Sequence, residues 1–164
     1  MDSFREIWFL DFEFCQRRGN VPRPLCYVAR ELKSNRLIRS WLDGGRSLSQ
    51  PYLDKYNLVV TYYASAECCH LSLNWPLPTY ILDLYAEFRC RTAGLPRPHG
   101  TSLLGALAYF GLDAITAVEK ETMRALAQRG GPYTDTEKSE LLTYCQTDVD
   151  GLCRLFTQMQ PNLD

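Results

Sequence analysis

The chain lacks the features of a membrane-spanning or secreted protein. No apolar run in its 164 residues approaches the roughly 20 residues that a membrane helix requires. The first six residues include two acids, and no long apolar stretch follows them, which argues against a signal peptide. We therefore expect a cytoplasmic protein.

The usual cysteine and histidine patterns of a zinc site are also missing. The chain has seven cysteines but no C-x-x-C pair, and its only histidines are His70 and His99. Structural zinc sites need several such ligands at close spacing, so this class of site is not expected. An odd number of scattered cysteines in a cytoplasmic protein indicates reduced, mostly buried thiols.

An excess of positive charge is missing as well. The formal net charge is −1, whereas a protein that binds duplexes of any sequence tightly is normally basic. Any contact with nucleic acid should therefore be local, such as a grip on one strand end. The same balance suits an enzyme that handles phosphate through metal ions, because its own site is acidic. The length and the 46% hydrophobic content fit one globular domain.

Patterns of apolar residues predict five strands. Consecutive apolar residues over 5–12 indicate a strand that is buried on both faces. Lys33-Ser34-Asn35 is a plausible hairpin turn between the next two strands. The five predicted strands are residues 5–12, 25–32, 36–42, 58–63 and 80–83.

The rest of the chain is predicted to be helical. The last helix is the clearest, because Thr134 and Glu137 form a capping box from which it should run to about Gln158. A hairpin is antiparallel, whereas a helical crossover makes its two strands parallel. We therefore expect an α/β fold with a mixed five-stranded sheet flanked by helices. The other predicted helices are residues 65–73, 84–91, 102–110 and 117–128.

Two carboxylates follow the apolar residues of the first strand. Asp11 and Glu13 are two residues apart, so their side chains share one face of the strand. They lie at the carboxyl end of a central strand, where ligands bind in open α/β sheets. Close carboxylates raise each other's pKa unless a cation lies between them. Mg²⁺ or Mn²⁺ with oxygen ligands suits such a place, although the pair alone is a weak signal.

A second acidic element lies on the last helix. Tyr144 and Asp148 are one helical turn apart. Asp148 falls within an apolar stripe on this helix, where a carboxylate is costly unless it is paired or holds a metal. The alternative is structural: Asp148 accepts a hydrogen bond from a neighbouring element. The stripe consists of Leu141, Cys145, Leu152 and Phe156.

Together these residues resemble the DEDD superfamily of 3′–5′ exonucleases, in the subgroup whose last motif is Tyr-x-x-x-Asp. Asp11-Phe12-Glu13 matches the first motif, and Tyr144 to Asp148 matches the third. The likeness is greatest to the proofreading domain of family A DNA polymerases and covers essentially the whole chain. The helix that begins at Ser102 also resembles the segment before the third motif. The resemblance implies a ribonuclease-H-like fold.

The second motif departs from the family pattern. The family usually supplies an aspartate from the helix after the fourth strand, and the matching acid here is Glu67, one methylene longer. The rival is Asp83, whose place at a strand end just before a helix fits a helix cap equally well. We expect Glu67 to be the fourth acid.

The resemblance implies hydrolysis of the terminal phosphodiester with two divalent ions, Mg²⁺ or Mn²⁺. Asp11 would bridge the ions, while Glu13 and Asp148 would complete the shell of the first. Glu67 would hold the second ion directly or through water. Tyr144 would orient the attacking water.

The resemblance also implies the substrate and the domain context. The expected partner is the 3′ end of single-stranded DNA, with Phe14 and Tyr63 as candidates for stacking on its bases. Residues 1–164 would form one exonuclease domain, the N-terminal part of a longer polymerase or a partner of a polymerase domain in another chain. Two alternatives stay open: a ribonuclease that trims RNA 3′ ends, and a binding module with a weakened site.

Overall fold

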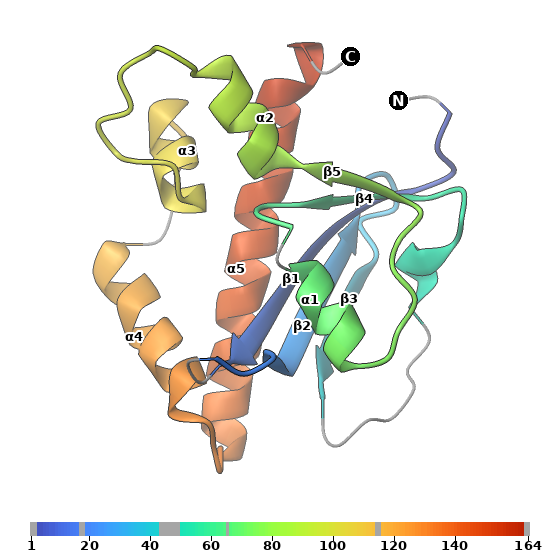
Figure 1. Cartoon of the computed structure of the whole chain (residues 1–164), viewed down its shortest axis with the longest axis vertical. Coiled ribbons are helices and arrows are strands. Elements are labelled where there is room, and N and C mark those ends of the chain that lie inside the picture. The colour runs from blue at the N-terminus through green and yellow to red at the C-terminus, as the bar shows by residue number, and fades with distance from the viewer. Residues whose placement is uncertain (1–2, 17–18, 43–49, 65, 114–115, 163–164) are drawn as a thin grey trace.

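A computed structural model describes residues 3–16, 19–42, 50–64, 66–113 and 116–162, with the side chains of 66–68, 117 and 162 excepted. Within this part the strands form one five-stranded sheet in the order β3-β2-β1-β4-β5 (Figure 1). The predicted fold class is therefore confirmed. The strands are β1 (Ile7–Cys15), β2 (Arg23–Glu31), β3 (Leu37–Trp41), β4 (Leu58–Thr61) and β5 (Tyr80–Asp83).

The sheet is mixed, as predicted. β1–β2 and β2–β3 are antiparallel pairs, and β1–β4 and β4–β5 are parallel pairs. The predicted turn at residues 33–35 joins β2 to β3. The buried carboxylate of Glu31 fixes this turn by accepting hydrogen bonds from the backbone amides of Lys33 at 2.9 Å and Ser34 at 2.6 Å. Asn35 completes the turn with a φ of 57°.

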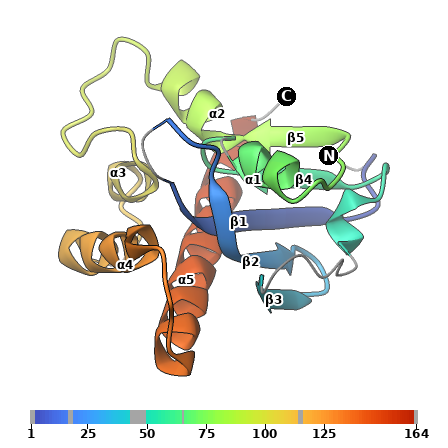
Figure 2. The same cartoon turned by 60° about the horizontal axis from the view of Figure 1, so that its bottom comes forward.

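Helices cover both faces of the sheet. The longest, α5, packs across β1, β2 and β3, whereas α1 packs against β1 and β2 from the other side (Figures 1 and 2). The predicted capping box of Thr134 and Glu137 begins α5. The helices are α1 (Ala66–Ser72), α2 (Leu84–Arg91), α3 (Leu103–Tyr109), α4 (Ala117–Arg129) and α5 (Asp135–Met159), with short 3₁₀ turns at Pro51–Leu53 and Gln160–Asn162.

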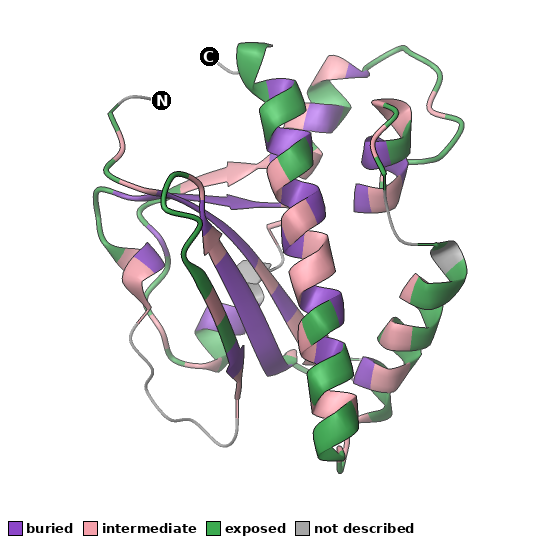
Figure 3. Cartoon of the chain, turned by 180° about the vertical axis from the view of Figure 1, so that it is seen from behind, coloured by how far each residue is buried: buried purple, intermediate pink, exposed green. Residues whose placement is uncertain are grey.

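Alternation along β1 divides the core into two layers. Ile7 and Phe9 belong to the apolar cluster beneath α5, and Phe9 meets Phe156 of α5 edge to face at 5.3 Å. Trp8 and Leu10 belong to the cluster on the α1 side. Buried segments recur along the whole length of α5, between exposed ones (Figure 3). Since side chains alternate along a strand, Asp11 and Glu13 are expected on the α5 face.

The ends of β1 to β4 differ from the prediction by one to three residues, and two of these differences have a clear cause. β1 continues to Cys15 instead of ending at residue 12, because β2 pairs with it along its whole second half. The strand predicted over 58–63 ends at Thr61, because Tyr63 has a positive φ of 70° that a strand cannot accommodate. No helix in the described ranges is long and apolar enough to cross a membrane.

Candidate active site

The end of β1 presents its acids at an open part of the sheet. Parallel pairing with β4 stops at Phe9, which lies opposite Val60, whereas antiparallel pairing with β2 continues to Cys15. Asp11 and Glu13 therefore have a strand on one side only. A bulge follows between Glu13 and Phe14. The acids are thus held by strand pairing with β2 and have no paired strand on the β4 side.

The third-motif residues reach the same place from α5. Asp11, Glu13, Tyr144 and Asp148 all line one pocket of about 190 Å³. The structure thus brings together four of the five predicted catalytic residues, from opposite ends of the chain. The described residues that line it are Asp11, Phe12, Glu13, Phe14, Tyr62, Leu103, Lys120, Arg124, Ala127, Gln128, Tyr144 and Asp148.

Burial makes the negative charge of the two β1 acids unfavourable. Burial first, and the Asp148 carboxylate second, raise the pKa of Asp11 from 3.8 to about 7. Burial and the neighbouring Asp11 raise the pKa of Glu13 well above its usual range. Such a site gains when a cation neutralises it. Carboxylate oxygens are the ligands that Mg²⁺ and Mn²⁺ prefer, so the donors fit the ions that the resemblance implies.

Cys145 of α5 adds a thiol beside these acids. Ligand atoms of Asp11, Glu13 and Cys145 all lie within 4.8 Å of one another. The thiol donates to the backbone oxygen of Asp11 at 3.3 Å and to its Oδ2 at 3.5 Å. Burial raises the pKa of Cys145 well above its ordinary value, so the thiol keeps its proton and acts as a donor that orients Asp11.

Tyr144 is a buried phenol at the edge of the pocket, with 8% of its surface exposed. Burial and the Asp148 carboxylate raise its pKa, which keeps the hydroxyl protonated. A protonated hydroxyl can donate to a water or a phosphate oxygen. This is the chemistry that its predicted role in orienting water requires.

Asp148 is already paired with a cation. Lys120 of α4 places Nζ 2.9 Å from Oδ2 and 3.2 Å from Oδ1 of Asp148. The ammonium also lies 5.8 Å from the centre of the Tyr144 ring. Sequence reasoning missed Lys120 and Arg124, which both line the pocket. Their spacing of four residues places both on one face of α4, and the sequence shows this. The sequence does not show that this face lies toward the acidic pocket.

The structure describes the side chain of only one of the two candidates for the fourth acid. Glu67 lies in α1, and its side chain is outside the described part of the chain, so its role stays a prediction. Asp83 accepts hydrogen bonds from the backbone amides of Tyr63 at 2.9 Å, Ala64 at 3.0 Å and Tyr85 at 2.9 Å. It thus caps α2 and holds the loop before α1, which is a structural role.

The two candidate substrate contacts also differ. Phe14 lines the acidic pocket and packs partly against the core. Tyr63 is 56% exposed and is not among the described residues that line that pocket. Its ring contacts Tyr85 edge to face at 4.9 Å, and the Arg89 guanidinium lies over Tyr85 at 5.5 Å. Tyr63 is thus the outer member of an exposed aromatic and basic cluster.

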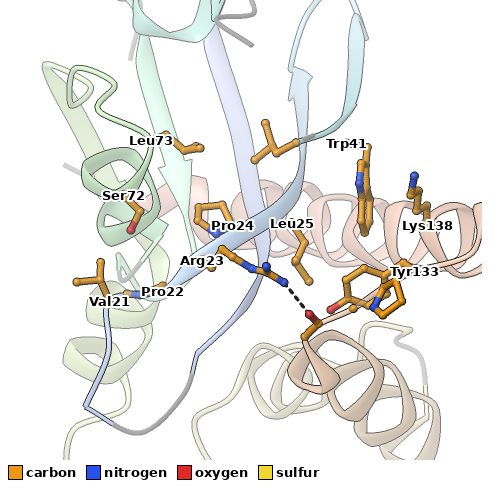
Figure 4. A pocket seen from close by; sticks show the side chains of 14 residues that line it. Val21, Pro22, Arg23, Pro24, Leu25, Trp41, Ser72, Leu73, Tyr133 and Lys138 are labelled. Atoms are coloured by element: carbon orange, nitrogen blue, oxygen red, sulfur yellow. Dashed lines mark hydrogen bonds between the residues drawn. The ribbon is translucent and has the colours of Figure 1, made fainter. Parts of the chain in front are cut away.

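A larger hollow of about 880 Å³ lies beside the turn between α4 and α5 (Figure 4). Arg23 crosses it and donates to the backbone oxygen of Gly130 at 2.8 Å. Trp41 and Tyr133 meet edge to face beside this bond. Its described lining contains no carboxylate. Despite its size, this hollow therefore offers no acidic metal ligands, and the candidate site is the smaller pocket.

No protein-family model matches the chain, and no curated protein matches it. Several solved structures are similar to the chain, among them the following two. One is the EXO domain of Nibbler from Aedes aegypti, with a TM-score of 0.51 and 13% identity over 97% of this chain and 83% of that one. The other is a nuclease in its apo form, with a TM-score of 0.61 and 10% identity over 98% of this chain and 78% of that one.

At these identities the likeness shows the fold alone, and that fold is the one found in an exonuclease domain. The resemblance noticed in the sequence is confirmed to this extent. The particular similarity to family A proofreading domains stays a prediction.

Proposed function

We propose that the chain is a metal-dependent 3′–5′ exonuclease that removes nucleotides from DNA 3′ ends by two-metal hydrolysis. One observation carries the proposal. Asp11 and Glu13 from the start of the chain line the same pocket as Tyr144 and Asp148 from its end. The fold similarity to an exonuclease domain supports it, because the acids occupy one pocket of such a fold.

The residues have separable tasks in this proposal. Asp11, Glu13 and Asp148 would hold the divalent ions, Mg²⁺ or Mn²⁺, together with Glu67. When bound, the ions would lower the pKa of the attacking water and stabilise the entering and leaving oxygens. Tyr144, kept protonated by its buried setting, would orient that water by hydrogen bonding.

The size of the pocket and the charge of the chain suit the end of a single nucleic-acid strand. A pocket of about 190 Å³ is too small for a duplex, and the net charge of −1 disfavours a broad duplex grip. Phe14 in the pocket and Tyr63 outside it would stack on successive bases, because base stacking on aromatic rings tolerates any sequence. Arg89, which lies over the Tyr85 ring that Tyr63 contacts, would add positive charge beside Tyr63.

The domain assignment is part of the same proposal. Residues 1–164 would act as one proofreading domain at the N-terminus of a longer polymerase. A binding module without catalysis is a second candidate. It is favoured by the ion pair between Lys120 and Asp148, since a cation of the protein itself already neutralises the third-motif acid.

The decisive experiment is incubation with end-labelled single-stranded DNA and RNA in Mn²⁺, Mg²⁺ or chelator. We expect DNA labelled at its 5′ end to shorten in a ladder with either metal and to stay intact in chelator. Asp11→Ala and Asp148→Ala are the controls for a contaminating nuclease. A preference for RNA would favour the trimming ribonuclease. Binding of DNA ends without cleavage by the folded wild type would favour the binding module.

A further inference from the structure

The pair of Lys120 and Asp148 is unusually well enclosed for an ion pair. The two side chains expose only 13% and 12% of their surfaces, and the ammonium contacts both carboxylate oxygens. By contrast, Arg5 and Asp54 form a pair whose side chains are 66% and 37% exposed. Exposed pairs contribute little, whereas breaking an enclosed pair leaves an uncompensated charge. The Lys120 ammonium is therefore held firmly in the acidic pocket.

The charges around the pocket do not cancel. β1 supplies Asp11 and Glu13, α5 supplies Asp148, and α4 supplies Lys120 and Arg124. The pocket thus has three carboxylates and two basic groups. Among the described residues, Lys120 is the basic group that bonds one of these carboxylates, Asp148. The Lys120 charge also acts favourably on both β1 acids. The Lys120 ammonium thus pairs with Asp148 and offsets a small part of the unfavourable charge on Asp11 and Glu13.

We propose that Lys120 is a built-in counterion that competes with divalent metal for Asp148. The proposal rests on the proposed function in one respect, namely that Asp148 is a metal ligand. Both oxygens of Asp148 are engaged by the ammonium, so an ion can bind this carboxylate well only after Lys120 withdraws. An ammonium that stayed would also repel a doubly charged ion a few ångströms away.

The residue type suits a counterion that has to leave. Lysine is a compact charge on a flexible four-carbon stem, unlike arginine, whose planar fork locks onto carboxylates with two bonds. The Tyr144 ring, 5.8 Å from Nζ, adds a weak second attraction. The consequence is that the metal-free fold keeps Asp148 paired, while its metal affinity is lower than the carboxylates alone would give.

The test measures Mn²⁺ binding to the full chain without nucleic acid. Binding is measured by calorimetry and by the electron paramagnetic resonance signal of free Mn²⁺. Lys120→Met keeps the stem and removes the charge, so we expect it to bind Mn²⁺ about tenfold tighter than wild type. Lys120→Gln, which keeps a hydrogen-bond donor toward Asp148, should shift in the same direction. Lys138→Met removes the same charge from α5 beside Asp135 and should leave the affinity unchanged.

Asp148→Ala separates the inference from the proposed function. If Mn²⁺ binds wild type and weakens in Asp148→Ala, the metal site stands. Unchanged or weaker Mn²⁺ binding by folded Lys120→Met and Lys120→Gln would then overturn the counterion role alone. If the folded wild type shows no Asp148-dependent binding of Mn²⁺, the metal site of the proposed function fails, and the inference fails with it.

Discussion

The carboxylate of Asp83 holds the backbone of Tyr63 in a left-handed conformation. Asp83 Oδ1 accepts from the Tyr63 amide at 2.9 Å, and Oδ2 accepts from the Ala64 amide at 3.0 Å. Tyr63 has a φ of 70°, which is costly for a residue with a side chain. The loop so fixed leads directly into α1, which carries Glu67.

Replacing Asp83 by Ala should chiefly lower stability. The change removes a helix cap and two hydrogen bonds to the strained loop, so we expect a loss of roughly 1 to 3 kcal/mol in denaturant unfolding. Glu67→Ala should instead stay as stable as wild type and lose cleavage, as Asp11→Ala does. If Asp83→Ala abolished cleavage while Glu67→Ala stayed active, with both folded, Asp83 would be the fourth acid.

Divalent ions should stabilise the folded protein. The pocket gathers carboxylates whose charges repel, and an ion that binds only the folded state raises its melting temperature. We expect saturating Mn²⁺ to raise the melting temperature of wild type, and chelator to reverse the shift. Asp11→Ala is the matched control and should respond weakly. An equal shift in both proteins would place the stabilising ion elsewhere.

The metal-free site should weaken the fold as pH rises from about 4 to about 7. The pKa of Asp11 is raised from 3.8 to about 7, mainly by burial. A carboxyl with a raised pKa favours the folded state while it is protonated. Its contribution to the free energy of unfolding is complete below the pKa of the unfolded state and is lost as the pH rises through the pKa of the folded state. The pKa of Glu13 is raised too and acts in the same direction.

The measurement is urea unfolding in chelator at several pH values, for wild type and Asp11→Asn. Other carboxyls follow the opposite trend, such as Glu137, whose pKa Arg129 lowers to about 2. The informative quantity is therefore the difference between the two proteins. Asp11→Asn should gain stability relative to wild type as pH rises toward 7. A difference independent of pH would contradict the raised pKa of Asp11.

Tyr144→Phe tests the hydroxyl separately from the ring. The variant keeps the packing of a side chain that is 8% exposed, so its stability should change little. The loss of an orienting donor should slow cleavage about 10- to 100-fold while the dependence on metal concentration persists. Single-turnover rates with Mn²⁺ measure this. Unchanged turnover would reduce Tyr144 to a packing residue.

Gly105→Ala should be destabilising, because α3 approaches the preceding loop very closely. A Cβ at Gly105 would lie 2.7 Å from the Gly100 backbone oxygen and nearer still to that of His99. Both are backbone atoms that cannot turn aside. We expect a loss of about 1 to 3 kcal/mol, seen as a lower melting temperature. Gly151→Ala on α5, where the neighbours are side chains, should be milder.

Local sequence predicted most elements of this fold correctly. The capping box of Thr134 and Glu137 marks the start of α5, and the apolar residues of β1 mark a central strand. These signals succeed because caps and periodicity act between residues close in sequence. The resemblance carried by the two acidic motifs also predicted that Asp11, Glu13 and Asp148 share one metal site.

Only the tertiary structure decided what neutralises that site. Lys120 and Asp148 are 28 residues apart, and their contact depends on how α4 packs against α5. The Tyr63 and Ala64 amides that Asp83 binds are likewise distant from it in sequence, by 20 and 19 residues. Pairing of charges that are distant in sequence depends on how the helices pack. The sequence shows which polar residues share a helix face, but it does not show which element that face contacts. Sequence thus located the acids, and packing supplied their counterion.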